Sequence, residues 1–184
     1  MWPYEWNGMP AVPEVRRAAL ALGSNIGDSA GTLQGAVDAL HATPGIEVVA
    51  VSAVFETDPV GGPDQDVFLN AVVMVDTSLE PIALLDAAQS IELDFGRVRD
   101  VRWGPRTLDI DVLAVADLVM EHERLELPHP RAHERAFVLV PWADVDPAGV
   151  VPGHGTVADL LASVGDAGVR RTAHALAATS DVTP

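Results

Sequence analysis

The order of predicted strands and helices is the feature that most constrains this fold. Apolar and β-branched runs predict strands at residues 17–22, 46–55, 67–75 and 107–115. Apolar residues recur at helical spacing after the N-cap candidates Asp28 and Ser29, and again between Pro81 and the stop signal Gly96. The order strand, helix, strand, strand, helix, strand is a split β-α-β pattern used twice. It predicts an α+β sandwich of ferredoxin-like type, with an antiparallel four-stranded core sheet and extra C-terminal helical segments.

The chain is divided into three segments by this pattern. Residues 1–14 contain three prolines and predict a disordered N-terminal extension. Residues 15–165 hold all the predicted core elements, and they are expected to form a single domain, which the motifs below make catalytic. Residues 166–184 are rich in alanine and predict a frayed tail.

Two residue types are missing from the chain, and their absence excludes several kinds of chemistry. All eleven basic residues are arginine, because the sequence contains no lysine. A P-loop, a protein-kinase site and Schiff-base catalysis each need a lysine, so these classes are excluded. Cysteine is also absent, which removes thiolate metal sites and disulfides and agrees with a cytoplasmic location. Any phosphate must be bound by arginine, backbone amides or metal ions.

The net charge of −16 bears on the partners of the chain. A molecule this acidic is repelled by nucleic acid and by anionic membranes. No apolar run in the sequence is long enough to span a membrane, and no secretory signal is evident. We therefore expect small-molecule partners, with no nucleic-acid or membrane partner, and a monomer is our working expectation.

Asp109 and Asp111 form the first candidate site. On a strand, two residues at this spacing point to one face, roughly 6 to 7 Å apart, while Leu108, Ile110 and Val112 point to the core. Paired carboxylates can hold a divalent ion, and Mg²⁺ prefers such oxygen ligands. The alternative is the solvated outer face of an amphipathic strand.

The second candidate site is a cluster of arginines just before these aspartates. Four of the eleven arginines fall within ten residues: Arg97, Arg99, Arg102 and Arg106. Guanidinium groups match phosphate oxygens in a bidentate manner and stay charged. The segment before Trp103-Gly104-Pro105 has no helix or strand periodicity, so it predicts a loop that closes over phosphates. The alternative is that these arginines pair with nearby acids such as Glu92.

Two weaker signals complete the set. Phe68 and Asn70 share one strand face, and together with Phe137 they suit a flat heteroaromatic ring with hydrogen-bonding edges. Core packing is the alternative for these residues. His129 lies between two prolines, where it either meets a ligand or forms part of a surface turn.

Several motifs, in the same order, resemble the 6-hydroxymethyl-7,8-dihydropterin pyrophosphokinase family. The block Arg102-Trp103-Gly104-Pro105-Arg106-Thr107-Leu108-Asp109-Ile110-Asp111 is the most specific of them. The others are Ala21–Asp28, Thr57-Asp58-Pro59, Phe68–Ala71, Gly96–Arg99 and Pro128-His129-Pro130. The resemblance runs from about Ala18 to Asp146. It implies a diphosphotransferase of folate biosynthesis that moves pyrophosphate from ATP to the pterin's hydroxymethyl oxygen and releases AMP.

The resemblance also implies a role for individual residues. Asp109 and Asp111 would hold two Mg²⁺ ions, and Arg97 and Arg106 would lie closest to the transferred group. The ATP-binding residues would be Gln89, Glu92, Arg99, Arg102, Trp103, Arg106, Val112, His129 and Arg135. The pterin would stack between Phe68 and Phe137 and contact Asn70, Thr57 and Val60.

Two positions depart from the family's pattern, and two other functions remain open. Phe68 stands where the family often has tyrosine, and Asp58 stands where many members have proline. A non-catalytic sensor that binds a nucleotide or another anion would need the arginines but not both aspartates. A Mg²⁺-dependent nucleotide hydrolase would release AMP without any pterin.

Overall fold

The computed structural model describes residues 14–59, 65–96 and 106–178. Five of the predicted site residues, Val60, Arg97, Arg99, Arg102 and Trp103, lie outside these ranges. The helices are α1 (Ser29–Ala42), α2 (Pro81–Asp94), α3 (Ala136–Val145) and α4 (Val157–Val164), with a 3-10 helix, η1 (Ala132–Glu134). The longer strands are β1 (Arg16–Ser24), β2 (Ile46–Val51), β4 (Phe68–Thr77) and β5 (Asp109–Val115). The shorter strands are β3 (Phe55–Thr57), β6 (Met120–His122), β7 (Leu125–Leu127), β8 (Val150–Val151), β9 (Gly155–Thr156) and β10 (Val169–Arg171).

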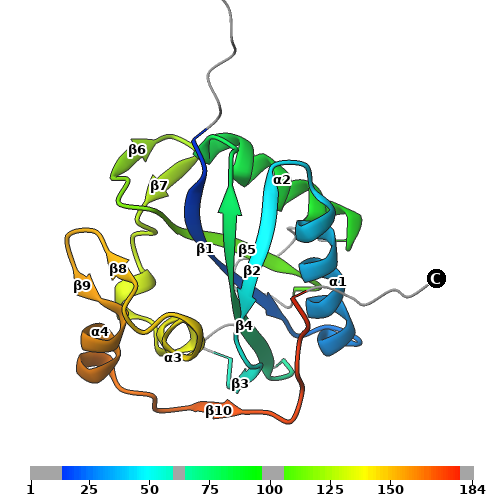
Figure 1. Cartoon of the computed structure of the whole chain (residues 1–184). Helices are drawn as coiled ribbons and strands as arrows, with labels where there is room; N and C mark the ends of the chain where they lie inside the picture. The colour runs from blue at the N-terminus through cyan, green and yellow to red at the C-terminus, as the bar shows by residue number, and fades with distance from the viewer. Residues whose placement is uncertain (1–13, 60–64, 97–105, 179–184) are drawn as a thin grey trace, which may run out of the picture.

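An antiparallel sheet forms the centre of the molecule (Figure 1). β1 lies between β4 and β5, and both β2 and β3 pair with the other edge of β4. The sheet has six strands in the described part of the chain rather than the four predicted, because β10 adds to β3 and the predicted strand 46–55 is two strands. The break between β2 and β3 follows from Ser52, whose hydroxyl accepts the Val72 N–H in place of a backbone carbonyl (2.9 Å).

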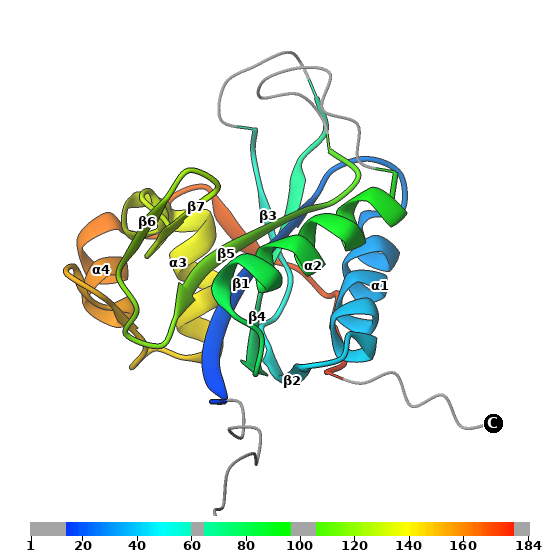
Figure 2. The same cartoon turned by 90° about the horizontal axis from the view of Figure 1, so that it is seen from above.

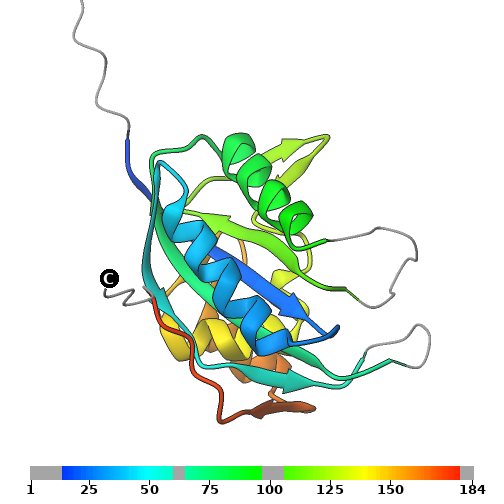
Figure 3. The same cartoon turned by 90° about the vertical axis from the view of Figure 1, so that its right-hand side faces the viewer.

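Helices cover both faces of this sheet (Figures 2 and 3). α1 and α2 pack on one face, over a core that includes Leu20, Leu22 and Ile110. α3 packs on the other face, where its own Trp142 shares a core with Val72 of β4, and α4 lies beside α3. Strand side chains alternate between the two faces, so each strand contributes to both cores. The extra C-terminal helical segments that the sequence predicts are α3 and α4. They lie on the face of the sheet opposite α1 and α2.

Part of the segment predicted as a frayed tail is paired with the sheet. Val169 lies opposite Thr57 and Arg171 opposite Phe55, so β10 forms an edge strand. Farther along, the Ala177 N–H donates to the Gln34 side chain of α1 (2.9 Å). These bonds hold residues 169–177 against the domain. Among the residues that the structure describes, no helix is long and apolar enough to cross a membrane.

Candidate functional site

A cavity of about 860 Å³ opens on the α3 face of the sheet, at the end where β1 finishes and β5 begins. Its floor is made by small residues of β1, Ala21 and Gly23. Gly23 lies opposite Asn70 of β4 on one side and opposite Asp109 of β5 on the other. Asn70 and Asp109 are thus two strand spacings apart, about 10 Å at the backbone. The small floor leaves room for a ligand between an amide and a carboxylate.

The paired aspartates lie on the same side of β5, as predicted. Both line the cavity, whereas Ile110 and Val112 are buried in the core on the α1–α2 face. Asp111 lies opposite Ala21 of β1, so its side chain emerges above a small residue. Arg106 lines the cavity too and forms an ion pair with Asp109. The structure therefore brings Arg106, Asp109 and Asp111 together at one end of the cavity.

The amide and aromatic side chains lie at the other end of the cavity. Phe68, Asn70, Thr57 and Phe137 all line it. Asn70 is buried, and its Nδ2 donates to the Thr57 hydroxyl (2.8 Å), which fixes the amide on this face. Phe137 is the second residue of α3, and the Arg135 guanidinium lies 5.6 Å from its ring centroid. The predicted pterin-binding residues within the described ranges are therefore grouped together.

The charge of Arg135 acts at both ends of the cavity, because its guanidinium lies over the Phe137 ring and interacts with Asp109 and Asp111. Burial, followed by the charge of Arg131, lowers the pKa of the Arg135 guanidinium below its ordinary value. The carboxylates of Asp111 and Asp109 act in the opposite direction, as expected for opposite charges close by. Arg135 is therefore a cation held beside the two aspartates by α3 and η1, and it is available to an anionic ligand in the cavity.

Asn25 joins the segments that border the cavity. Its side-chain oxygen accepts the Arg106 N–H (2.8 Å), and its own N–H donates to the Arg106 carbonyl (3.1 Å). Its Nδ2 donates to the Gln65 side chain (3.0 Å) and to the Asp66 carbonyl (3.1 Å). Asn25 is only 4% exposed. The turn after β1 therefore holds Arg106 and the residues before β4 in fixed positions, a role that the sequence analysis did not assign to Asn25.

Four residues predicted to contact ATP do not line this cavity: Gln89, Glu92, Val112 and His129. Val112 is a core residue. Glu92 is 2% exposed and accepts the Ile110 N–H (2.7 Å), so it contacts the backbone of β5 between the two aspartates. Gln89 lies near Arg124 (3.5 Å) on the exposed side of α2.

His129 is bonded to β5 on one side and to the start of η1 on the other. Its N–H donates to the Leu113 carbonyl of β5 (2.8 Å), and its Nδ1 accepts the Arg131 N–H (3.1 Å). Burial, followed by the charge of Arg135, lowers the pKa of His129 below 6.5. The imidazole is therefore neutral at neutral pH, and it holds the loop that carries Arg131 and Arg135.

Several cavity residues were not predicted from the sequence. They are Gln65, Arg131, Glu134 and the segment Ala167–Val169. Arg131 directly follows the Pro-His-Pro motif and Glu134 directly precedes Arg135, so their nearness in the chain was a usable signal. Ala167–Val169 had no such signal, because the alanine-rich composition around it is typical of a tail.

The donor groups of the cavity can be set against the needs of a divalent metal ion, which binds oxygen ligands. Within residues 14–59, 65–96 and 106–178, no group of three or more His, Asp or Glu side chains is placed to hold a metal ion. Asp109 and Asp111 provide two hard oxygen donors. Two protein ligands are compatible with Mg²⁺, which usually completes its shell with water and substrate phosphates. Among the residues that the structure describes, three arginines and four carboxylates line the cavity: Arg106, Arg131, Arg135, Asp58, Asp109, Asp111 and Glu134. This set fits a metal that arrives with a polyphosphate.

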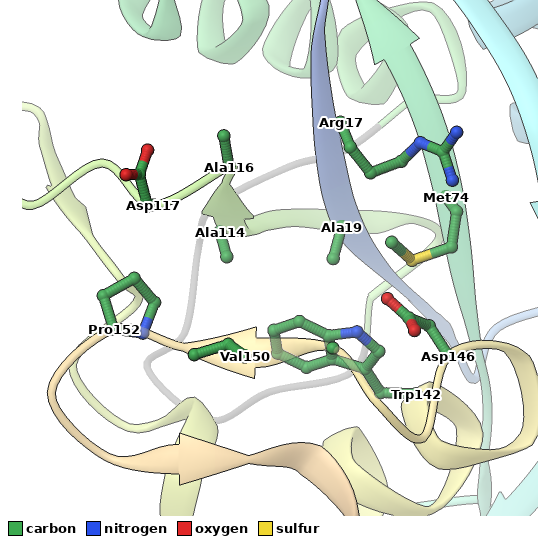
Figure 4. A pocket seen from close by; sticks show the side chains of 11 residues that line it. Arg17, Ala19, Met74, Ala114, Ala116, Asp117, Trp142, Asp146, Val150 and Pro152 are labelled. Atoms are coloured by element: carbon green, nitrogen blue, oxygen red, sulfur yellow. The ribbon is translucent and has the colours of Figure 1, made fainter.

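A second cavity, of about 270 Å³, lies on the same face toward the other end of β1. Figure 4 shows Trp142 across it, with Ala19 and Ala114 nearby and Arg17 and Asp146 at its margin. Arg17 is paired with Asp76 (2.5 Å). This cavity lacks the neighbouring carboxylates of β5, so the larger one is the candidate site.

Comparison with known proteins gives consistent matches. The family model for 7,8-dihydro-6-hydroxymethylpterin-pyrophosphokinase (HPPK) matches residues 19–147. The 2-amino-4-hydroxy-6-hydroxymethyldihydropteridine pyrophosphokinase of Methylorubrum extorquens is 55% identical over 155 residues, which cover 84% of this chain and 98% of the relative. The enzyme of the same name from Pseudomonas aeruginosa is 44% identical, over 85% of this chain and 97% of the relative.

A solved structure shows the same fold. The crystal structure of Plasmodium falciparum HPPK-DHPS wild type with pteroate has a TM-score of 0.64 at 16% identity. The match covers 82% of this chain, and the chain spans 42% of the length of that solved chain.

Proposed function

Because the chain belongs to the 7,8-dihydro-6-hydroxymethylpterin-pyrophosphokinase family, we propose that its large cavity is where the reaction of that family takes place. The chain transfers pyrophosphate from ATP to the hydroxymethyl group of 6-hydroxymethyl-7,8-dihydropterin in folate biosynthesis, and AMP is released. The observation that carries the assignment to this cavity is the row Asn70, Gly23, Asp109 across three neighbouring strands. On this face of the sheet, the Asn70 amide can hydrogen-bond to the edge of a ring, and the Asp109 carboxylate can bind a metal–phosphate complex.

The pterin occupies the end of the cavity at Asn70. Phe68 and Phe137 offer aromatic faces for stacking, and the amide offers one donor and one acceptor to the ring edge. The Asn70–Thr57 hydrogen bond orients the amide before the ligand arrives. The hydroxymethyl group then points along the floor of β1 toward Asp109 and Asp111. The loss of the tyrosine hydroxyl at Phe68 leaves this stacking intact.

The triphosphate of ATP occupies the other end. The hydroxymethyl oxygen attacks the β-phosphorus and loses its proton, while the bond from that phosphorus to the oxygen bridging the α- and β-phosphates breaks. Negative charge then grows on the departing AMP oxygen. Arg106 and Arg135 are positioned cations that offset this charge, and such preorganised groups are a main source of rate enhancement. Holding both substrates on one face supplies much of the remaining acceleration.

Asp109 and Asp111 are the residues that would hold Mg²⁺, and two ions are the expected number. When bound, the metal neutralises phosphate charge and orients the phosphates. The lining of the cavity supports this assignment, because its carboxylates outnumber its arginines in the described residues and would repel a free triphosphate. Arg97, Arg99, Arg102 and Trp103, outside those residues, are proposed to complete the phosphate site, and Val60 is proposed to complete the pterin site. Gln89, Glu92, Val112 and His129 remain proposed ATP contacts.

We propose a ferredoxin-like arrangement of β1, α1, β2, β4, α2 and β5, supported by the antiparallel order β2, β4, β1, β5. A single catalytic domain over residues 15–165 stays a prediction. So do the extension over residues 1–14, the cytoplasmic location, the monomeric state and the lack of a nucleic-acid partner.

One assay separates the proposed function from its alternatives. The protein is incubated with ATP and Mg²⁺, with and without the hydroxymethyl dihydropterin, and AMP is measured. We expect AMP only when the pterin is present, in equal amounts with the pterin diphosphate. Equal AMP release without the pterin would indicate a nucleotide hydrolase. No AMP in either case would favour the non-catalytic sensor.

A further inference from the structure

We propose that the C-terminal strand β10 is part of the pterin-binding site and that Arg170 is a positioning residue for the segment Thr57–Pro59. This inference rests on the proposed function, because it concerns the pterin end of the same cavity. It assigns a role to residues beyond 147, where the family match ends.

The first observation is where β10 lies. Ala167, Gly168 and Val169 line the cavity at the β3 edge of the sheet, together with Thr57, Asp58 and Pro59. Gly168 has a positive φ of 77°, a conformation that favours glycine and turns the chain into β10. Val169 then pairs with Thr57, the residue whose hydroxyl accepts from Asn70. The C-terminal segment therefore contacts the part of the site that orients the pterin-reading amide.

The second observation is the ion-pair network of Arg170. Its Nη2 lies 2.8 Å from Glu56 Oε1 and 2.8 Å from Asp58 Oδ1, and its Nη1 lies 3.3 Å from Asp58 Oδ2. Arg170 thus makes a bidentate contact with Asp58 and also bonds to Glu56. Such planar, forked contacts fix geometry as well as charge. Arg170 therefore joins β10 to both residues that flank Thr57 in the chain.

The charge of Asp58 gives this contact a function. Asp58 adds a negative charge to the lining of a cavity that also holds Asp109, Asp111 and Glu134. Hydrogen bonding to Arg170 lowers the pKa of Asp58, so the carboxylate stays ionised and paired. Arg170 thereby restrains the segment and offsets its charge.

β10 also has anchors that do not involve Arg170. Arg171 pairs with Asp144 of α3 (2.7 Å), and the same carboxylate accepts the Ala53 N–H (2.8 Å). The Thr172 N–H donates to the Val54 carbonyl (2.9 Å). Removing the Arg170 guanidinium should therefore leave β10 in place, so the effect on Thr57–Pro59 can be measured separately from a loss of fold.

The test compares Arg170→Gln with Arg16→Gln in the full-length chain. Arg16 is a matched control, because it also pairs with two carboxylates, Glu14 and Glu80, but it begins β1 at the end away from the cavity. The measured quantities are the KM values for pterin and ATP, kcat, and the melting temperature. We expect Arg170→Gln to raise the pterin KM about fivefold, the scale of a well-formed exposed ion-pair network, with ATP KM and melting temperature matching the control.

A second comparison tests the partner. In an Asp58→Asn background the charge to be offset is gone, so Arg170→Gln should raise the pterin KM by less than half as much. The inference is overturned if Arg170→Gln leaves the pterin KM within twofold of the wild type. It is also overturned if pterin KM, ATP KM and melting temperature change together, which indicates a general loss of structure.

A result that refutes the proposed function can be distinguished from one that refutes the role of Arg170. A wild-type chain that releases no pterin-dependent AMP refutes the reaction and not the role of Arg170. In that case pterin affinity is measured by calorimetry in the presence of a non-hydrolysable ATP analogue. Weaker binding by Arg170→Gln, but not by Arg16→Gln, would uphold the positioning role, and equal binding by all three proteins would refute it.

Discussion

Asp109 and Asp111 reach the cavity because the residues across from them on β1 are small. Gly23 and Ala21 lie opposite the two aspartates, and a larger side chain at either position would fill the floor on which the substrates are proposed to lie. Arg106 is held next to Asp109 by its ion pair and by the hydrogen bonds of its backbone to Asn25. The reacting groups are therefore positioned mainly by backbone pairing within the sheet.

Arg106→Ala should lower turnover more than it weakens ATP binding. Its guanidinium is proposed to offset charge that grows in the transition state, and the loss of one such donor costs about 10² to 10³ in kcat. Steady-state kinetics with varied ATP would show the split between kcat and KM. A variant with normal kcat and a raised ATP KM would make Arg106 a ground-state binding residue instead.

His129 makes the stability of the fold depend on pH. Its pKa is lowered by burial first and by Arg135 second, so the fold favours the neutral imidazole. As the pH falls through 6.5, the unfolded chain takes up a proton more readily than the folded chain, and His129 then reduces stability. That loss is complete once the pH is below the folded pKa, and it is absent well above 6.5.

NMR titration of the His129 ring checks this directly. We expect a pKa below 6.5 in the wild type. In Arg135→Gln the pKa should move upward toward 6.5 without reaching it, because burial remains. A wild-type pKa at or above 6.5 would contradict the burial of His129 between β5 and η1.

Among the structural elements, the turn after β1 has the widest influence on the site. Through Asn25 it holds the start of the Arg106–Asp111 segment and the residues before β4 together. Both ends of the cavity therefore depend on one buried amide that binds no substrate in the proposed arrangement.

Asn25→Ala and Asn25→Asp test the hydrogen bonds that the Asn25 side chain accepts and donates. Alanine removes every side-chain hydrogen bond and leaves buried partners unpaired, at a cost of about 1 to 3 kcal/mol in the free energy of unfolding. Aspartate keeps an acceptor for the Arg106 N–H, but it loses the donor and turns a buried carboxylate oxygen toward the oxygens of Gln65 and Asp66. Denaturant unfolding should therefore rank the wild type above both variants. Equal stability of alanine variant and wild type would refute the role of Asn25 as a joining residue.

The sequence predicted the elements that have strong periodicity and missed those that depend on long-range contacts. The alternation around Asp109 and Asp111 was enough to place both carboxylates on one face, and the same held for Phe68 and Asn70. The split between β2 and β3 was missed because it depends on Ser52 bonding to a strand distant in the chain. β10 was missed because its three residues have no periodicity of their own, and they are held by pairing with β3 and by ion pairs.

For the whole molecule, the charge of −16 raises the question of how it binds a polyphosphate. The arginines that line the cavity lie on different elements: Arg106 precedes β5, whereas Arg131 and Arg135 flank η1. Arg106 pairs with Asp109, and the charge of Arg135 acts on both β5 aspartates, whereas Arg131 pairs with Glu134. Because carboxylates still outnumber arginines among the described lining residues, a divalent ion that arrives with the nucleotide would complete the neutralisation.

The central claim is that this chain moves the β- and γ-phosphates of ATP as one unit to the pterin, at the Asp109–Asp111 site. The most direct test uses ATP labelled at the γ-phosphate, with Mg²⁺ and pterin, and follows the label in the wild type and in Asp111→Ala. We expect the label in the pterin diphosphate, with unlabelled AMP released in equal amount. Asp111→Ala should lose this transfer by about a hundredfold or more while its melting temperature stays close to that of the wild type. Label in free phosphate or pyrophosphate, or a fully active Asp111→Ala enzyme, would contradict the account.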